Sequence, residues 1–83
     1  MITFFAYNAG EQFEALDDDA ALLLLRMGER PDCVGLWKKE DLPRMRRKLI
    51  KVYNRADTPR ETAEGVLGIV VKAQAAGTEV VWG

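Results

Sequence analysis

Residues 2–16, which read ITFFAYNAGEQFEAL, decide the fold class. The β-branched and aromatic residues at 2–7 predict a strand that is apolar on both faces. Asn8 and Gly10 tolerate a positive φ, so they predict a turn. Residues 11–16 then predict a returning strand, because apolar and polar side chains alternate along them. Its inward positions are Phe13 and Ala15, and its outward positions are Gln12 and Glu14. The pattern indicates a β-hairpin, and a helix that begins at Gly10 is the competing interpretation.

A third strand is predicted over residues 78–82, with Val80 and Trp82 on one face and Val81 on the other. The strand at 2–7 is expected in the centre of the sheet, because it is apolar on both faces. Residues 34–37 belong to a segment that is expected to be irregular. Whether they form a short extended piece is left open.

Three helices are expected between the hairpin and the last strand. The first follows Asp17-Asp18-Asp19 and ends at Gly28, since acidic residues favour the positive end of the helix dipole and glycine suits a left-handed exit. Its leucines lie all round the helix, which predicts that it is mostly buried. The third begins at Thr58-Pro59-Arg60-Glu61, where threonine caps, proline takes the first helical position and Glu61 completes a capping box. It ends at Gly77.

The second helix is expected to begin near Glu40, with Pro43 in its first turn. At helical spacing its apolar side chains share one arc: Leu42, Met45, Leu49, Ile50, Val52 and Tyr53. Five cations share the opposite arc and form a candidate interaction surface, here named the basic face: Arg44, Arg47, Lys48, Lys51 and Arg55. Arg46 falls on the apolar side, where it needs to snorkel or to meet an acid.

These elements predict an α+β fold in the order β-β-α-α-α-β, with a three-stranded sheet packed against three helices. The length of 83 residues fits a single domain, 1–83. Three helices do not fit comfortably on one face of three short strands. We expect the sheet to be covered mainly on one side, with the other side partly open or buried in an oligomer. A core this small supplies only about 3–5 kcal/mol of net stability, which also favours self-association.

Two glycines, Gly65 and Gly68, lie inside the third predicted helix, although each costs about 1 kcal/mol relative to alanine there. On a helical wheel they share a face of small residues with Ala75 and Ala76. This candidate close-packing face predicts the close approach of another backbone. Whether that backbone belongs to the same chain or to a second copy is left open.

Charge is distributed unevenly along the chain, although the formal net charge is −1. Residues 1–32 carry two basic and seven acidic side chains, and residues 33–57 carry eight basic and three acidic ones. The basic face is therefore a solvated surface, a site for an acidic protein or for the chain's own acidic third, or a site for nucleic-acid phosphates. Against nucleic acid stand an isoelectric point near 5.4 and a basic face without aromatic side chains or Asn or Gln for base reading. A homodimer or an acidic protein partner is expected first, with weak, sequence-nonspecific nucleic-acid binding as the alternative.

No constellation of residues indicates catalysis, a metal or a cofactor. The chain has no histidine and one cysteine, so a zinc site and a base for a Cys33 nucleophile are both lacking, and Cys33 is expected to be inert. Asp17, Asp18 and Asp19 are consecutive, whereas calcium loops space their ligands at alternate positions. A lone cysteine, no signal peptide and no apolar run near the ~20 residues of a membrane span predict a cytoplasmic protein without a membrane partner. The expected function is that of a non-catalytic interaction module.

Short motifs along most of the chain are shared with one known family. They are Ile2-Thr3-Phe4, Gly10, Met27-Gly28, Pro31, Gly35, Glu40-Asp41-Leu42-Pro43, Ala75-Ala76-Gly77 and Val80-Val81-Trp82-Gly83. With these motifs the chain resembles a small uncharacterised proteobacterial family catalogued as domain of unknown function eighteen-forty. Members of that family carry a longer, often acidic stretch before the third helix and an alanine-rich second helix, whereas this chain has only residues 54–57 and a basic helix. The family has no assigned activity, so the resemblance implies a bacterial cytoplasmic protein and no catalytic residue.

Overall fold

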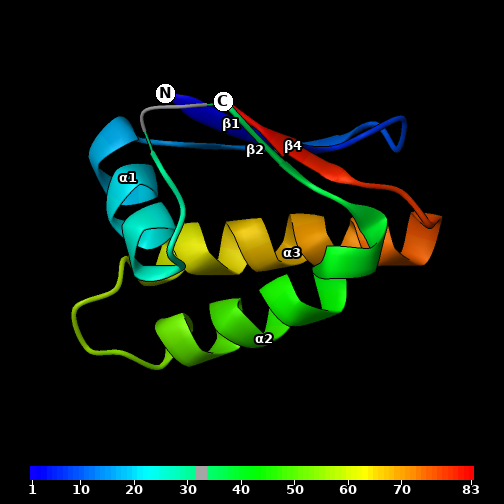
Figure 1. The fold of residues 1–83 in the computed structure, drawn as a ribbon. Helices are drawn as coiled ribbons and strands as arrows, with labels where there is room; N and C mark the ends of the chain where they lie inside the picture. Colours follow the sequence, from blue (N-terminus) through cyan, green and yellow to red (C-terminus); the bar gives the residue numbers. More distant parts are fainter. Residues whose placement is uncertain (32–33) are drawn as a thin grey trace.

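The computed structural model describes residues 1–31 and 34–83, which form an α+β fold with an antiparallel sheet (Figure 1). The strands are β1 (Ile2–Ala6), β2 (Glu11–Ala15), β3 (Gly35–Trp37) and β4 (Val80–Trp82). The helices are α1 (Asp17–Arg26), α2 (Leu42–Tyr53), which follows a short 3-10 helix η1 (Lys39–Asp41), and α3 (Arg60–Ala76). In the described part of the chain, all three α-helices lie on one side of the sheet.

The predicted hairpin and the central place of the first strand are confirmed. β1 pairs with β2 on one side and with β4 on the other, so that Phe4 lies opposite both Phe13 and Trp82. The prediction of a three-stranded sheet is wrong, because β3 pairs with β4 and gives the strand order β2-β1-β4-β3. Three residues are too few for a periodic pattern, and the hydrogen bonds that hold β3 come from a strand far away in the sequence.

The helices are stacked in layers, which is how three of them fit over a narrow sheet (Figure 1). α3 is the central layer: it contacts β1, β2 and β4 on one side and α2 on the other. α1 packs against α3 near one end. Because α3 is covered from two sides, residues such as Ala63, Val66 and Val70 are fully buried.

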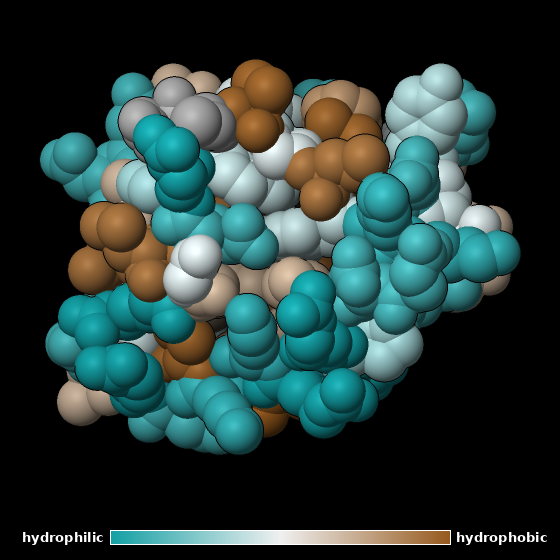
Figure 2. Space-filling model, viewed as in Figure 1, coloured by the Kyte–Doolittle hydropathy of each residue, from teal (hydrophilic) through white to brown (hydrophobic). Residues whose placement is uncertain are grey.

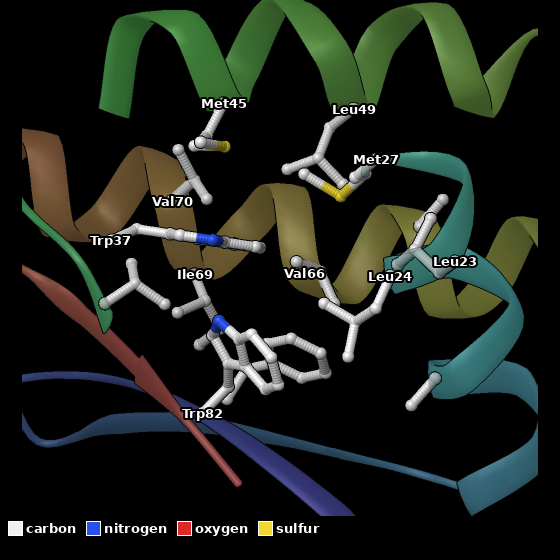
Figure 3. Close-up of a cluster of buried hydrophobic side chains, with 14 of the residues drawn as sticks. Leu23, Leu24, Met27, Trp37, Met45, Leu49, Val66, Ile69, Val70 and Trp82 are labelled. Atoms are coloured by element: carbon white, nitrogen blue, oxygen red, sulfur yellow. The ribbon is translucent and has the colours of Figure 1, made fainter. Parts of the chain in front are cut away.

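An aromatic cluster forms the core between the sheet and the helices. The ring centroid of Phe4 lies 6.1 Å from that of Trp37 and 6.3 Å from that of Trp82. Figure 3 shows both indoles beside Val66, Ile69 and Val70 of α3. Gly35 completes this packing, because a Cβ atom there would lie 2.1 Å from the Trp82 indole. The sheet can therefore hold Trp82 in this position only if residue 35 has no side chain.

The N-terminal ends of α1 and α3 differ from the prediction. Asp17, Asp18 and Asp19 all lie in the first turn of α1, where their charges favour the helix dipole, but within the described residues no side chain caps that helix. The capping box is wrong, because Pro59 rather than Thr58 occupies the N-cap position of α3. The Thr58 hydroxyl is buried and has no hydrogen-bond partner in the described part of the chain.

The C-terminal ends of α1 and α3 are confirmed, since Gly28 and Gly77 both adopt a positive φ, of 83° and 67°. In α1 the left-handed residue closes the helix with backbone bonds. The Gly28 N–H donates to the Leu25 carbonyl at 3.0 Å and the Glu29 N–H to the Leu24 carbonyl at 2.8 Å. Such bonds satisfy terminal carbonyl groups that side chains would otherwise need to reach.

The prediction that the first helix is mostly buried is confirmed, since Leu25, at 60% exposure, is the one exposed residue among residues 20–27. Ile50, which the sequence pattern placed on the apolar arc of the second helix, is 44% exposed, because α2 lies at the outside of the helical layers and buries a narrower arc than the pattern predicts. Arg46, for which the sequence predicted snorkelling or an acidic partner, is exposed. Its Nη1 donates to Gln74 Oε1 at 3.3 Å, so its partner is an amide and not an acid. α2 itself begins at Leu42 rather than near Glu40, since the residues before it form the 3-10 helix η1.

Candidate functional site

Four cations of the basic face lie on the solvent side of α2, opposite the buried residues that pack on α3. The prediction that Arg55 belongs to this helix is wrong, because α2 ends at Tyr53 and Arg55 lies just beyond it. Arg44, Arg47, Lys51 and Arg55 are exposed, and Lys48 is partly buried. Figure 2 shows polar side chains over the lower part of the molecule, where α2 lies. The helical spacing of the five cations thus becomes one continuous charged surface in the structure.

Two cations of the basic face have acidic partners from flanking residues. Arg44 Nη2 lies 3.5 Å from Asp41 Oδ1 at the start of α2. Arg55 Nε lies 3.7 Å from Asp57 Oδ1 just beyond its end. Both pairs are solvent-exposed, so they contribute little to stability but reduce the charge presented by the two ends of the face.

The three cations between these ends differ in their surroundings. Lys48 Nζ donates to the carbonyl oxygen of Met27 at 3.2 Å and thereby connects α2 with the end of α1. Arg47 and Lys51 have no ion-pair or hydrogen-bond partner within the described residues. The middle of the basic face therefore presents unneutralised charge.

A hollow of about 250 Å³ opens between the end of α1 and the second half of α2. Four cationic and two apolar side chains line it: Arg26, Lys48, Lys51, Arg55, Met27 and Val52. The sequence pattern indicated three of the cations but not Arg26, which belongs to another helix and reaches this place only through tertiary packing. Arg26 forms an ion pair with Asp57, the same carboxylate that Arg55 approaches.

The candidate close-packing face of α3 is half correct. A Cβ atom on Gly65 would lie 2.2 Å from the Phe13 ring, so this position is closely packed within the monomer. The neighbour is an aromatic side chain of β2 and not a backbone. Gly68 has open space around it, with nothing within 4 Å of a Cβ atom among the described residues. The wheel grouped both glycines because it shows direction around one helix and not what lies opposite.

The outer face of the sheet is the second candidate surface. One row of cross-strand neighbours runs over it: Gln12, Phe5, Val81 and Leu36. Phe5 and Val81 are partly exposed and Leu36 is 49% exposed, and no helix of the described residues covers the row. Figure 2 shows apolar side chains in the upper part of the view, on the side where the sheet lies. The sequence pattern indicated Phe5 and Val81, but Leu36 was missed together with β3.

Tyr53 forms a polar contact between α2 and α3. Its hydroxyl donates to Glu64 Oε1 at 2.8 Å, and the Arg60 Cζ lies 5.3 Å from the ring centroid. The hydrogen bond to Glu64 and the charge of that carboxylate raise the pKa of Tyr53 above its usual value of 10.0, and Arg60 opposes this shift. The phenol thus stays protonated, and able to donate this hydrogen bond, to a higher pH than an unperturbed tyrosine.

Other features concern metals and membranes. Within residues 1–31 and 34–83, no three Asp and Glu side chains come together as ligands for a metal ion. Cys33, which the sequence predicts to be inert, lies outside the described residues. In the described part of the chain, no helix has the length and apolar character needed to span a bilayer.

Comparisons with protein-family models, with curated proteins and with solved structures found no match for the chain. The resemblance to the proteobacterial family therefore stays a prediction based on its short motifs. Function has to be inferred from the surfaces described above.

Proposed function

We propose that this chain is a non-catalytic interaction module that associates with a second copy of itself through the outer face of its sheet. The observation that carries the proposal is the uncovered row formed by Phe5, Val81 and Leu36. The largest contiguous apolar patch that a monomeric protein exposes is often a functional one, and such patches commonly mark interaction sites.

The row is compatible with two-fold pairing. A two-fold axis parallel to the strands would place Phe5 of one copy over Val81 of the other, because β1 and β4 are the two central strands. No charged side chain belongs to this row, whereas Glu14 lies in edge strand β2 and Lys38 directly follows edge strand β3. An apolar, uncharged centre with charges at the rim is typical of protein interfaces.

The dimer is expected to be weak. Four short strands, about 4.8 Å apart and rising about 3.3 Å per residue, present a face on the order of 300 Å². Stable interfaces bury about 800 Å² per partner, so association should depend strongly on concentration.

Sedimentation velocity from about 10 µM to about 1 mM, the range that reveals weak interfaces, tests the proposal. The wild type should shift from monomer to dimer over this range, and Leu36→Lys should stay monomeric. Leu25→Lys is the matched control, since Leu25 is 60% exposed on α1 and not on the sheet. Val81→Thr, which keeps a β-branched side chain, repeats the test if Leu36→Lys lowers stability. A wild type that is monomeric throughout, or equal dimerisation of all variants, contradicts the proposal.

Weak nucleic-acid binding through the basic face is the alternative. The observation that favours it is that Arg47 and Lys51 have no partner among residues 1–31 and 34–83. Each phosphate contact lowers log K by about 0.9 per unit of log salt concentration, so binding to phosphates should weaken steeply as salt is added. Gel shifts on generic DNA and RNA at two salt concentrations distinguish this function from self-association, which needs no nucleic acid.

A further inference from the structure

The hollow between α1 and α2 plays no part in the proposed self-association, and its lining side chains call for a separate explanation. Its base is formed by Met27 and Val52, which are 2% and 5% exposed. The rest of its lining is formed by the side chains of Arg26, Lys48, Lys51 and Arg55. An apolar base with a small number of convergent charged groups is typical of small-molecule sites.

Hydrogen bonds to the end of α1 account for only one of these cations, Lys48. Cations near a helix C-terminus commonly bond its last carbonyl groups. At the end of α1, however, backbone N–H groups of Met27, Gly28 and Glu29 already donate to those carbonyls, and Lys48 takes the carbonyl of Met27. Lys51 has no partner within the described residues. The hollow therefore has positive charge beyond what the helix ends need.

One carboxylate positions two of the cations without neutralising the group. Asp57 pairs with Arg26 and lies 3.7 Å from Arg55 Nε, so it holds both guanidinium groups at the same hollow. Four cationic side chains and one carboxylate give the hollow a net local charge of about +3.

The geometry points to a binding site for a small phosphate monoester, with the dianionic phosphoryl group at the cationic side chains and a short apolar body against Met27 and Val52. Guanidinium and ammonium groups match phosphate oxygens in charge and hydrogen-bond geometry, and a dianion gains more than a carboxylate from several cations. The volume of about 250 Å³ is at the low end of small-molecule sites, which favours a ligand of few atoms over a nucleotide.

The test is an NMR titration of the full chain with phenyl phosphate at low ionic strength, beside inorganic phosphate and phenylacetate. Saturable shifts are expected at the amides of Arg26, Met27 and residues 51–55, strongest for phenyl phosphate. The double variant Lys51→Gln/Arg55→Gln should bind at least about tenfold more weakly, because it loses two charge-assisted contacts. Its matched control is Arg44→Gln/Arg47→Gln, which removes the same charge from the basic face outside the hollow and should change the affinity less than about twofold.

Three results would overturn the site. Equal weakening in both double variants would mean diffuse attraction by the basic face. Equal affinity for phenylacetate would contradict the phosphoryl group. No saturable shift with phenyl phosphate, in a wild type whose dispersed spectrum shows that it is folded, would mean that the hollow binds no such ligand.

Discussion

The two faces of the sheet are built from the same strands but have opposite environments. On the inner face, Phe4 and Val80 are fully buried beneath the helices. One residue further along the same strands, Phe5 and Val81 point the other way and remain partly exposed. Since β1 and β4 are apolar on both faces, β-propensity does not distinguish the two sides, and only the presence of α3 does. Matched substitutions of neighbouring residues can therefore measure what each face contributes.

The largest difference is expected at Trp82, which the inner face buries between Phe4 and Trp37. Trp82→Ala should lower the free energy of unfolding by about 3–5 kcal/mol. That loss equals the whole net stability of so small a core, so the variant should be largely unfolded at room temperature. Circular dichroism melts and the dispersion of amide NMR signals measure this.

Trp82→Phe is the control for Trp82→Ala. It keeps an aromatic ring and removes the buried indole N–H, which has no hydrogen-bond partner in the described part of the chain. Phenylalanine should therefore cost much less than alanine. If Trp82→Ala melted cooperatively at the wild-type temperature, the aromatic cluster would not be the core.

The direct comparison of the faces is Val80→Ala with Val81→Ala. Val80→Ala should cost about 2 kcal/mol, because it removes two buried carbon atoms and leaves a cavity. Val81→Ala should cost less than about 1 kcal/mol, since that side chain is already partly hydrated. Urea denaturation at low protein concentration, where the chain is monomeric, gives both values. Equal losses would show that the outer face is as well covered as the inner one.

A third pair uses α3, whose two glycines differ in what lies opposite. Gly65→Ala should lower stability by about 1–3 kcal/mol, because the added methyl group meets the Phe13 ring. Gly68→Ala should raise stability by up to about 1 kcal/mol, since it gains helix propensity in open space. Thermal melts of both variants decide this. The same sign of change in both would contradict the assigned contact with Phe13.

Much of the fold could be predicted because its signals are local. Alternation gave the hairpin and the faces of β4, and glycines marked two helix ends. β3 was missed because three residues carry almost no period, and its pairing with β4 is a contact between distant segments. Gly35 had no assigned role for the same reason: its need for a bare Cα atom comes from the Trp82 indole and not from its own neighbours in the sequence.

The candidate sites show the same limit. The helical wheel placed five cations on one side of α2, and the structure exposes that side. It could not include Arg26, because only the packing of α1 beside α2 brings that side chain to the hollow. It also could not distinguish Gly65 from Gly68, since the difference between them is the Phe13 ring of another element.

The smallest expected effect lies away from both faces of the sheet, at the contact of Tyr53 with Glu64 between α2 and α3. Because the folded chain raises the pKa of Tyr53 above 10.0, its protonated form is stabilised by folding. This contribution is fully present below about pH 10 and is lost as the pH rises through the folded pKa. Tyr53→Phe should therefore melt slightly below the wild type at pH 8, and the difference in Tm should shrink above pH 10.

Glu64→Gln should bring the Tyr53 pKa, read from ultraviolet absorbance, back toward its usual value, whereas Arg60→Gln should raise it further. A difference in Tm between the wild type and Tyr53→Phe that stays constant from pH 8 to about pH 11.5, beyond the usual range of tyrosine, would mean that the phenol does not donate to Glu64.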